Sequence, residues 1–289
     1  MSNEPMRGIP YLLVLLLLVI ALAGGAAAGI LGYIWYTGGS GEASLSVDDA
    51  LATREANDAA MADAVGTAIM DTANTVIADA VAIAIADAVD TSVAAAMEAQ
   101  APAESGSAAV EFSIVAAESE ASFTLEEDLS GVRTTVIGTT TELGGSIFVD
   151  MANPSNSVIG TIVVNARTLE TDNSFRNRAL RSQILRSAQD EFEFIVFEPR
   201  ELSNFSVDSV TVGEMLSFDI TGDLTVTDVT RSVTFEAMVM LDSEAQISGS
   251  ASVNLLHADF GLTIPEVPRV ANVTDDVDLK LEFVARLAE

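Results

Sequence analysis

Apolar and polar residues alternate with a period of two through much of the chain between residues 110 and 289. Successive side chains of a β-strand point to opposite faces of a sheet, so this period predicts strands with one buried face. About ten such runs follow one another, separated by Gly, Asn, Asp and Pro, which are typical turn residues. The pattern therefore predicts a mainly β domain, built as an antiparallel sandwich or barrel.

Two of these runs are apolar on both faces, namely "SIFV" (146–149) and "FEFIVF" (192–197). A strand with two apolar faces needs a second layer on each side, or an apolar cavity on one side. An eight-stranded barrel has room for one elongated ligand in its interior. The pattern allows a ligand tunnel, and it equally allows an interior filled by side chains.

One segment of this half, "SFRNRALRSQILRSAQD" (174–190), has a helical pattern instead. Leu180, Ile184 and Leu185 fall on one side of the expected helix, and Ser174 is a candidate N-cap. We therefore expect a single helical insertion in the β domain.

The amino-terminal part of the chain predicts a membrane anchor. No charged residue occurs from Ile9 to Tyr36, and about 20 apolar residues span a bilayer. Positive charge before the segment and acidic residues after it predict that residues 1–8 are a short cytoplasmic tail and that the rest lies outside the cell membrane, periplasmic or at the cell surface. A cleaved signal peptide is the alternative. The G-x-x-x-G of Gly25 and Gly29 could pair two such helices, or it could be small-residue filler.

Residues 37–109 form a separate Ala/Asp-rich segment. Alanine is the best helix former, so a helical stalk is one interpretation. The composition favours the other interpretation, a solvated, low-complexity spacer with fluctuating helix. A helical stalk could also make the protein a homo-oligomer.

Composition narrows the chemistry. The chain has 13 basic and 43 acidic residues, a net charge of -30, no cysteine and one histidine, His257. Disulfides and thiolate sites are excluded, and a multi-histidine metal site cannot form. The acidity argues against nucleic acid as a partner. With one histidine and no carboxylate pair placed on one strand face, we expect no enzymatic activity, no cofactor and no metal site.

Five of the 13 basic residues lie between Arg167 and Arg186. Two explanations are open. The arginines could border a tunnel mouth and face an anionic headgroup or a bilayer. They could instead pair with the surplus of carboxylates on the protein itself.

The β half resembles a known family in several motifs. The most specific are "GDLTVTDVTRSVTF" (222–235) and "HADFGL" (257–262), and weaker ones are "GGSIFVD" (144–150), "FEFIVFEP" (192–199) and "DDVDLKLEF" (275–283). Residues 110–289 are similar to the YceI-like lipid-binding family. The chain departs from the family pattern at Glu193, Asp228 and His257, where that pattern has Pro, Gly and Arg.

The resemblance implies an antiparallel, lipocalin-like β-barrel of about eight strands that binds a long apolar lipid, such as a polyisoprenoid, an isoprenoid quinone or a fatty-acid derivative. The alternative is a stalked interaction or adhesion module with a solid barrel and no ligand. In the tunnel reading, alternation along the strands and the apolar side of the helix select the candidate lining residues: Phe123, Leu125, Val136, Ile147, Ile162, Val164, Leu180, Ile184, Leu185, Phe194, Val196, Leu224, Phe235 and Phe260. The candidate headgroup residues at the mouth are Arg176, Arg178 and Arg181.

Overall fold

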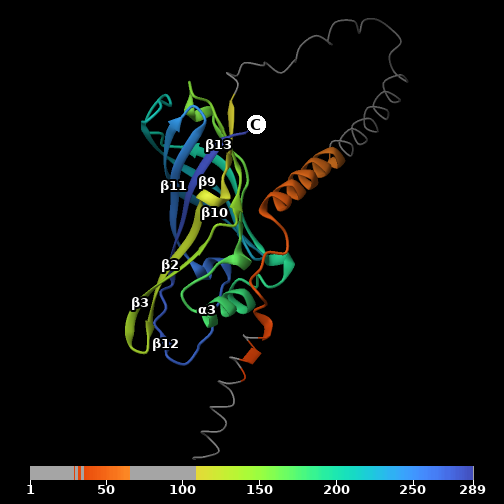
Figure 1. Ribbon diagram of the computed structural model, residues 1–289, viewed down its shortest axis with the longest axis vertical. Coiled ribbons are helices and arrows are strands. Elements are labelled where there is room, and N and C mark those ends of the chain that lie inside the picture. Colours follow the sequence, from red (N-terminus) through yellow and green to blue (C-terminus); the bar gives the residue numbers. More distant parts are fainter. Residues whose placement is uncertain (1–28, 30–31, 34–35, 66–108, 289) are drawn as a thin grey trace, which may run out of the picture.

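The computed structural model describes residues 29, 32–33, 36–65 and 109–288 (Figure 1). Its strands are β1 (Val110–Ile114), β2 (Glu120–Leu129), β3 (Val132–Thr140), β4 (Leu143–Gly144), β5 (Ser146–Val149), β6 (Val158–Ile159), β7 (Ile162–Asn165), β8 (Phe194–Ser203), β9 (Met215–Val226), β10 (Val229–Ser243), β11 (Gln246–Leu256), β12 (Val270–Ala271) and β13 (Asp276–Leu287). The short helices between them are η1 (Ala116–Glu118), η2 (Pro154–Asn156), η3 (Ala166–Thr168), α3 (Ser174–Ala179), η4 (Leu180–Ile184), η5 (Asp190–Phe192) and η6 (His257–Phe260).

The strands form one antiparallel sheet that curls around an interior. Its order is β4-β7-β8-β9-β10-β11-β13-β1-β5-β6, and β2 adds to β13 and carries β3 on its other side. Because β4 follows β3 after two residues and pairs with β7, the two ends of the sheet approach each other. The prediction of a mainly β, antiparallel fold is confirmed. Instead of a barrel of about eight strands, the described residues form one curled sheet of 13 strands.

The longest hairpin explains how the sheet separates its two faces. β9 and β10 pair from Val226–Val229 to Met215–Met240, around a turn in which Thr227 has a positive φ of 55°. Along β9 alternate residues are buried, because Phe218, Ile220 and Leu224 point into the core. Threonines of the two strands hydrogen-bond on the outer face. The period of two in the sequence therefore corresponds directly to the inner and outer faces of the curled sheet.

The helical insertion is shorter than the sequence predicted. The α-helix α3 has six residues and continues into η4, a π-helical turn. Asn173 rather than Ser174 is the N-cap, and its side chain accepts hydrogen bonds from the amides of Phe175 and Arg176. After η4 the chain turns at Arg186, whose φ is positive (54°), and so the predicted helix cannot reach residue 190.

Part of the predicted stalk lies against the outside of the curled sheet. Residues 38–54, which we call the strap, contain the start of a helix that covers residues 47–65. The side chain of Ser46 accepts from the amide of Asp49 and donates to its carboxylate, and so caps the helix. Val47 packs on Val163 and Val196. The rest of the predicted stalk, from residue 66 to residue 108, lies outside the described residues.

The predicted anchor, residues 9–36, also lies mostly outside the described residues. Within the ranges that the structure describes, no helix is long and apolar enough to cross a membrane.

Candidate ligand cavity

An apolar cavity of about 280 Å³ occupies the interior of the curled sheet. Side chains of β2, β5, β7, β8, β9, β10, β11 and β13 line it, and η4 and η6 contribute at one end. Phe197 and Phe235 meet edge to face across this wall, with ring centroids 4.9 Å apart. Gly222 lies against the Phe197 ring, because a Cβ at this position would meet the ring at 2.8 Å. The interior is therefore hollow between well-packed walls.

Most of the predicted lining residues meet at this cavity. Eleven of the fourteen line it: Phe123, Leu125, Ile147, Ile162, Val164, Leu180, Ile184, Leu185, Leu224, Phe235 and Phe260. The structure thus brings together residues from five strands and two helical turns. Their role in ligand binding stays a prediction.

Three predicted lining residues lie elsewhere. Val136 is buried opposite Leu125 in the β2–β3 pair, but it does not reach the cavity. Phe194 and Val196 are on the outer face of β8, where they pack in the cluster that contains Val47 of the strap. Their neighbours Ile195 and Phe197 line the cavity instead. The prediction for β8 was therefore shifted by one residue, which turns every side chain of a strand to the other face.

Sequence reasoning also missed cavity residues outside the predicted set. Phe218 and Ile220 share the inner face of β9 with Leu224, and so the alternation that identified Leu224 could have found them. Phe205, in the loop that follows β8, stacks on Phe218 with the two ring centroids 5.2 Å apart. No periodic signal marks a loop residue of this kind.

A few polar groups border the cavity, among them His257 at the start of η6. Nδ1 of His257 lies 3.1 Å from the carbonyl oxygen of Leu262. Because a carbonyl only accepts, Nδ1 carries a proton in this contact. Within the described part of the chain, no group of three or more His, Asp or Glu side chains could hold a metal ion.

A second, more polar pocket, which we call the vestibule, adjoins the η4 end of the cavity. It shares Ile184, Phe260 and Leu262 with the cavity and adds polar groups of the η4 end, the β9–β10 turn and the segment after η6: Gln183, Arg186, Thr227, Asp228, Gly261 and Thr263. Long ligands commonly combine an apolar chain with one polar end, and this arrangement offers matching surfaces to both.

Electrostatics fix one wall of the vestibule. Arg186 forms a salt bridge to Asp228 at 2.5 Å, and its guanidinium lies 4.0 Å from the ring centre of Phe192. A hydrogen bond from the Thr227 hydroxyl, one from the backbone amide of Asp228 and the charge of Arg186 hold the pKa of the Asp228 carboxyl below its usual value. The departure of this residue from the family pattern thus creates an ion pair beside the cavity.

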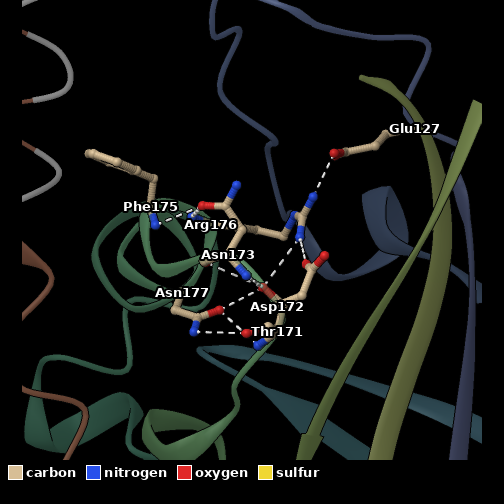
Figure 2. Close-up of polar contacts among 7 residues, drawn as sticks. All are labelled: Glu127, Thr171, Asp172, Asn173, Phe175, Arg176 and Asn177. Atoms are coloured by element: carbon tan, nitrogen blue, oxygen red, sulfur yellow. Dashed lines mark hydrogen bonds and ion pairs between the residues drawn. The ribbon is translucent and has the colours of Figure 1, made fainter. Parts of the chain in front are cut away.

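The other arginines of the basic stretch bind partners within the protein. Arg176 pairs with Glu127 and Asp172, each at 2.6 Å (Figure 2). Nε of Arg181 donates to the carbonyl oxygen of Gly38 at 2.7 Å, and burial lowers the pKa of this guanidinium. Arg178 lies half-buried on α3.

Arg167 completes this pattern, because it binds Asp190 and Glu193. Most of these contacts agree with the second explanation, in which the arginines pair with carboxylates of the protein itself. Among the five arginines of this stretch, all of which the structure describes, Arg186 lines the vestibule.

Comparison with known proteins agrees with the architecture. The family model described as the YceI-like domain matches residues 112–285, which is more than half of the chain. The chain belongs to the YceI-like domain family. No curated protein matches the chain significantly.

Several solved structures are similar to the chain at low identity. The chain is 15% identical to BcnA from Burkholderia cenocepacia, with a TM-score of 0.46, over 59% of this chain and 98% of that one. It is 15% identical to a polyisoprenoid binding domain from Saccharophagus degradans, with a TM-score of 0.46, over 62% of this chain and 99% of that one. A YceI protein of Campylobacter jejuni is 16% identical, with a TM-score of 0.39, over 51% of this chain and 82% of that one.

Proposed function

We propose that this YceI-like protein binds one long apolar molecule, such as a polyisoprenoid, an isoprenoid quinone or a fatty-acid derivative, in the cavity of its curled sheet. The observation that carries the proposal is the cavity itself, about 280 Å³ in volume and walled mainly by aliphatic and aromatic side chains. Each CH₂ group that leaves water for such a wall contributes about 0.8 kcal/mol, so a long chain binds without directional contacts.

The proposal is a binding function rather than catalysis. A binding site needs apolar surface and a few polar groups at one end, and the cavity and vestibule supply both. The hollow interior does not favour the alternative of an adhesion module with a solid core.

The proposal includes a location. The uncharged run from Ile9 to Tyr36 is long enough to anchor the protein in the cell membrane, with the YceI-like domain on the extracytoplasmic side. An anchor would keep the domain beside the bilayer that stores its apolar ligand.

Native mass spectrometry of the full chain, purified in mild detergent, tests the binding function. We expect an adduct that organic extraction removes and that fragments as a prenyl or acyl lipid. Repeated purification without any adduct, together with no binding of a fluorescent polyprenyl lipid, would contradict the proposal.

A matched pair of variants on β10 locates the bound lipid. Ala237 is buried on the cavity wall, whereas its neighbour Met238 is 55% exposed on the outer face. Ala237→Phe fills part of the cavity, and so we expect the adduct and the fluorescent-lipid binding to be lost. Met238→Phe adds a similar ring to the other face and should bind normally. Equal binding by both variants would place the ligand outside the cavity.

A further inference from the structure

The strap is attached to the end of the curled sheet that carries the vestibule. Gly38 is buried, and its carbonyl accepts from Arg181 of η4. Gly41, with a positive φ of 83°, lies directly over the same guanidinium, since a Cβ there would meet Nη1 at 2.7 Å. The same turn of helix carries Gln183 and Ile184, which line the vestibule. The strap and the vestibule therefore both contact η4.

A buried carboxylate holds the next part of the strap. Glu193 is 1% exposed and accepts from the amide of Ser44 at 2.8 Å and from its hydroxyl. Its other partners are Asn165 at 2.9 Å and Arg167 at 3.2 Å. A buried charge with several donors is costly to leave unpaired, so these contacts fix Ser44 firmly to the sheet.

The helix of the strap adds an apolar contact. Val47 and Leu51 point at Gly144 and lie near Val163 and Val196, and Arg54 forms a salt bridge to Glu198 at 2.8 Å. Residues 47, 50, 51 and 54 follow the helical spacing of one face. Contacts thus extend over the whole strap, from Gly38 to Arg54.

The predicted anchor, residues 9–36, ends two residues before this attachment. Tyr36 is its last residue, and Gly38 is the first residue of the strap. Two residues of extended chain span at most about 7 Å. The medium that surrounds the carboxyl-terminal end of residues 9–36 must therefore lie close to η4.

We propose that the strap is a bracket that holds the η4 end of the curled sheet, with the vestibule, against the surface of a phospholipid bilayer. This inference rests on the membrane anchor of the proposed function. The bracket would let an apolar ligand pass between membrane and cavity with little exposure to water. Figure 1 shows residues 36–41 beside α3, at the end of the molecule opposite the C-terminus.

Single-cysteine labelling can test this orientation, since the natural chain has no cysteine. Ser174→Cys places a fluorophore at the exposed start of α3, and Glu244→Cys places one in the β10–β11 turn. β10 has 15 residues, so the two ends of the sheet are roughly 45 Å apart at ~3.3 Å per residue. The full-length proteins are reconstituted into phosphatidylcholine vesicles that contain a lipid with a quenching headgroup.

We expect strong loss of fluorescence at position 174 and little or none at position 244. A Gly-Ser insert of about 12 residues between Thr37 and Gly38 gives the tether a flexible reach of about 20 Å and leaves the strap docked. The insert should therefore abolish most of the quenching at position 174. Val47→Asp, which releases the strap helix from the sheet, should reduce it as well.

Equal quenching at both positions, stronger quenching at position 244, or quenching at position 174 that survives the insert would each overturn the bracket. Vesicle flotation and mass spectrometry distinguish a failure of the bracket from a failure of the proposed function. A protein that does not float with vesicles has no membrane anchor, and the bracket is then rejected with it. A protein that floats and shows the expected quenching but carries no lipid supports the bracket and contradicts the ligand.

Discussion

The two faces of β8 are both apolar, but they are buried against different things. Ile195 and Phe197 face the cavity, while Phe194 and Val196 face the strap. The inner face surrounds space that a ligand could fill, and the outer face is already covered by residues of the same chain. Hydrophobicity along a strand therefore shows that a face is covered, and it does not show what covers it.

Among substitutions on the two faces, we expect the largest loss of stability for one on the inner face. Phe197→Ala removes a ring that packs on Phe235 and against Gly222, so we expect the free energy of unfolding to fall by about 3–5 kcal/mol. Urea unfolding of the reconstituted protein measures this loss. Lipid binding should change too, whereas protease protection of the strap should not. Exposure of the strap in this variant would mean that the faces are not independent.

A somewhat smaller effect is expected where the strap meets the start of β8. Glu193→Gln keeps the size of the side chain but removes the charge that faces Arg167, which we expect to cost about 2–3 kcal/mol. Limited proteolysis should then cut within residues 38–54, and lipid binding by the folded protein should persist. Glu191→Gln, at a nearby exposed carboxylate, is the control and should leave both measurements unchanged.

The strap helix itself should give an intermediate loss. Val47 is 5% exposed, and Val47→Ala removes two methyl groups, for which we expect about 1.5 kcal/mol of lost stability. Met61→Ala, on the exposed continuation of the same helix, should have no measurable effect. If both substitutions destabilise equally, the helix packs along its whole length and the strap extends beyond Arg54.

The smallest effect concerns the vestibule. Because the pKa of Asp228 is lowered in the folded protein, this carboxylate favours folding at pH above its unfolded value near 3.9. The contribution is lost only as the pH falls through the lower folded value. An NMR titration should therefore find the midpoint of Asp228 below its usual value, with the Arg186 contact intact. A midpoint at or above the usual value would show that the ion pair does not form in solution.

The sequence predicted the inner face best where one face of a strand is polar. On β2 and β9, threonine, serine and acidic residues mark the outer face, so Phe123, Leu125 and Leu224 were placed correctly at the cavity wall. β8 lacks this contrast, because its outer face is covered by the strap, and the phase was shifted by one residue. The sequence did not indicate the docking of the strap. The apolar face of its helix, formed by Val47, Ala50 and Leu51, is short and lies within an Ala-rich segment that shows no clear contrast between faces.

The arginines show a second limit of sequence reasoning. The basic stretch was recognised, but the partner of each side chain depends on contacts between distant residues. Arg176 meets Glu127 from 49 residues away, and Arg181 meets the backbone of Gly38 from 143 residues away. Two departures from the family pattern, Glu193 and Asp228, turned out to bind the strap and Arg186. Such pairings become visible only in three dimensions.

The order of segments along the chain gives the strap one more property. The strap precedes the sheet, and residues 66–108 connect the two covalently. Cleavage within that connection would leave a short amino-terminal fragment whose Ser44 and Val47 still occupy their sites on the sheet. We expect the nicked protein to remain a two-piece complex, and a separately supplied peptide of residues 36–65 to reassociate with a domain that begins at residue 109. The YceI-like domain would then be a split protein. With the membrane anchor of the proposed function, the amino-terminal piece would stay in the membrane and would hold the sheet there through the strap.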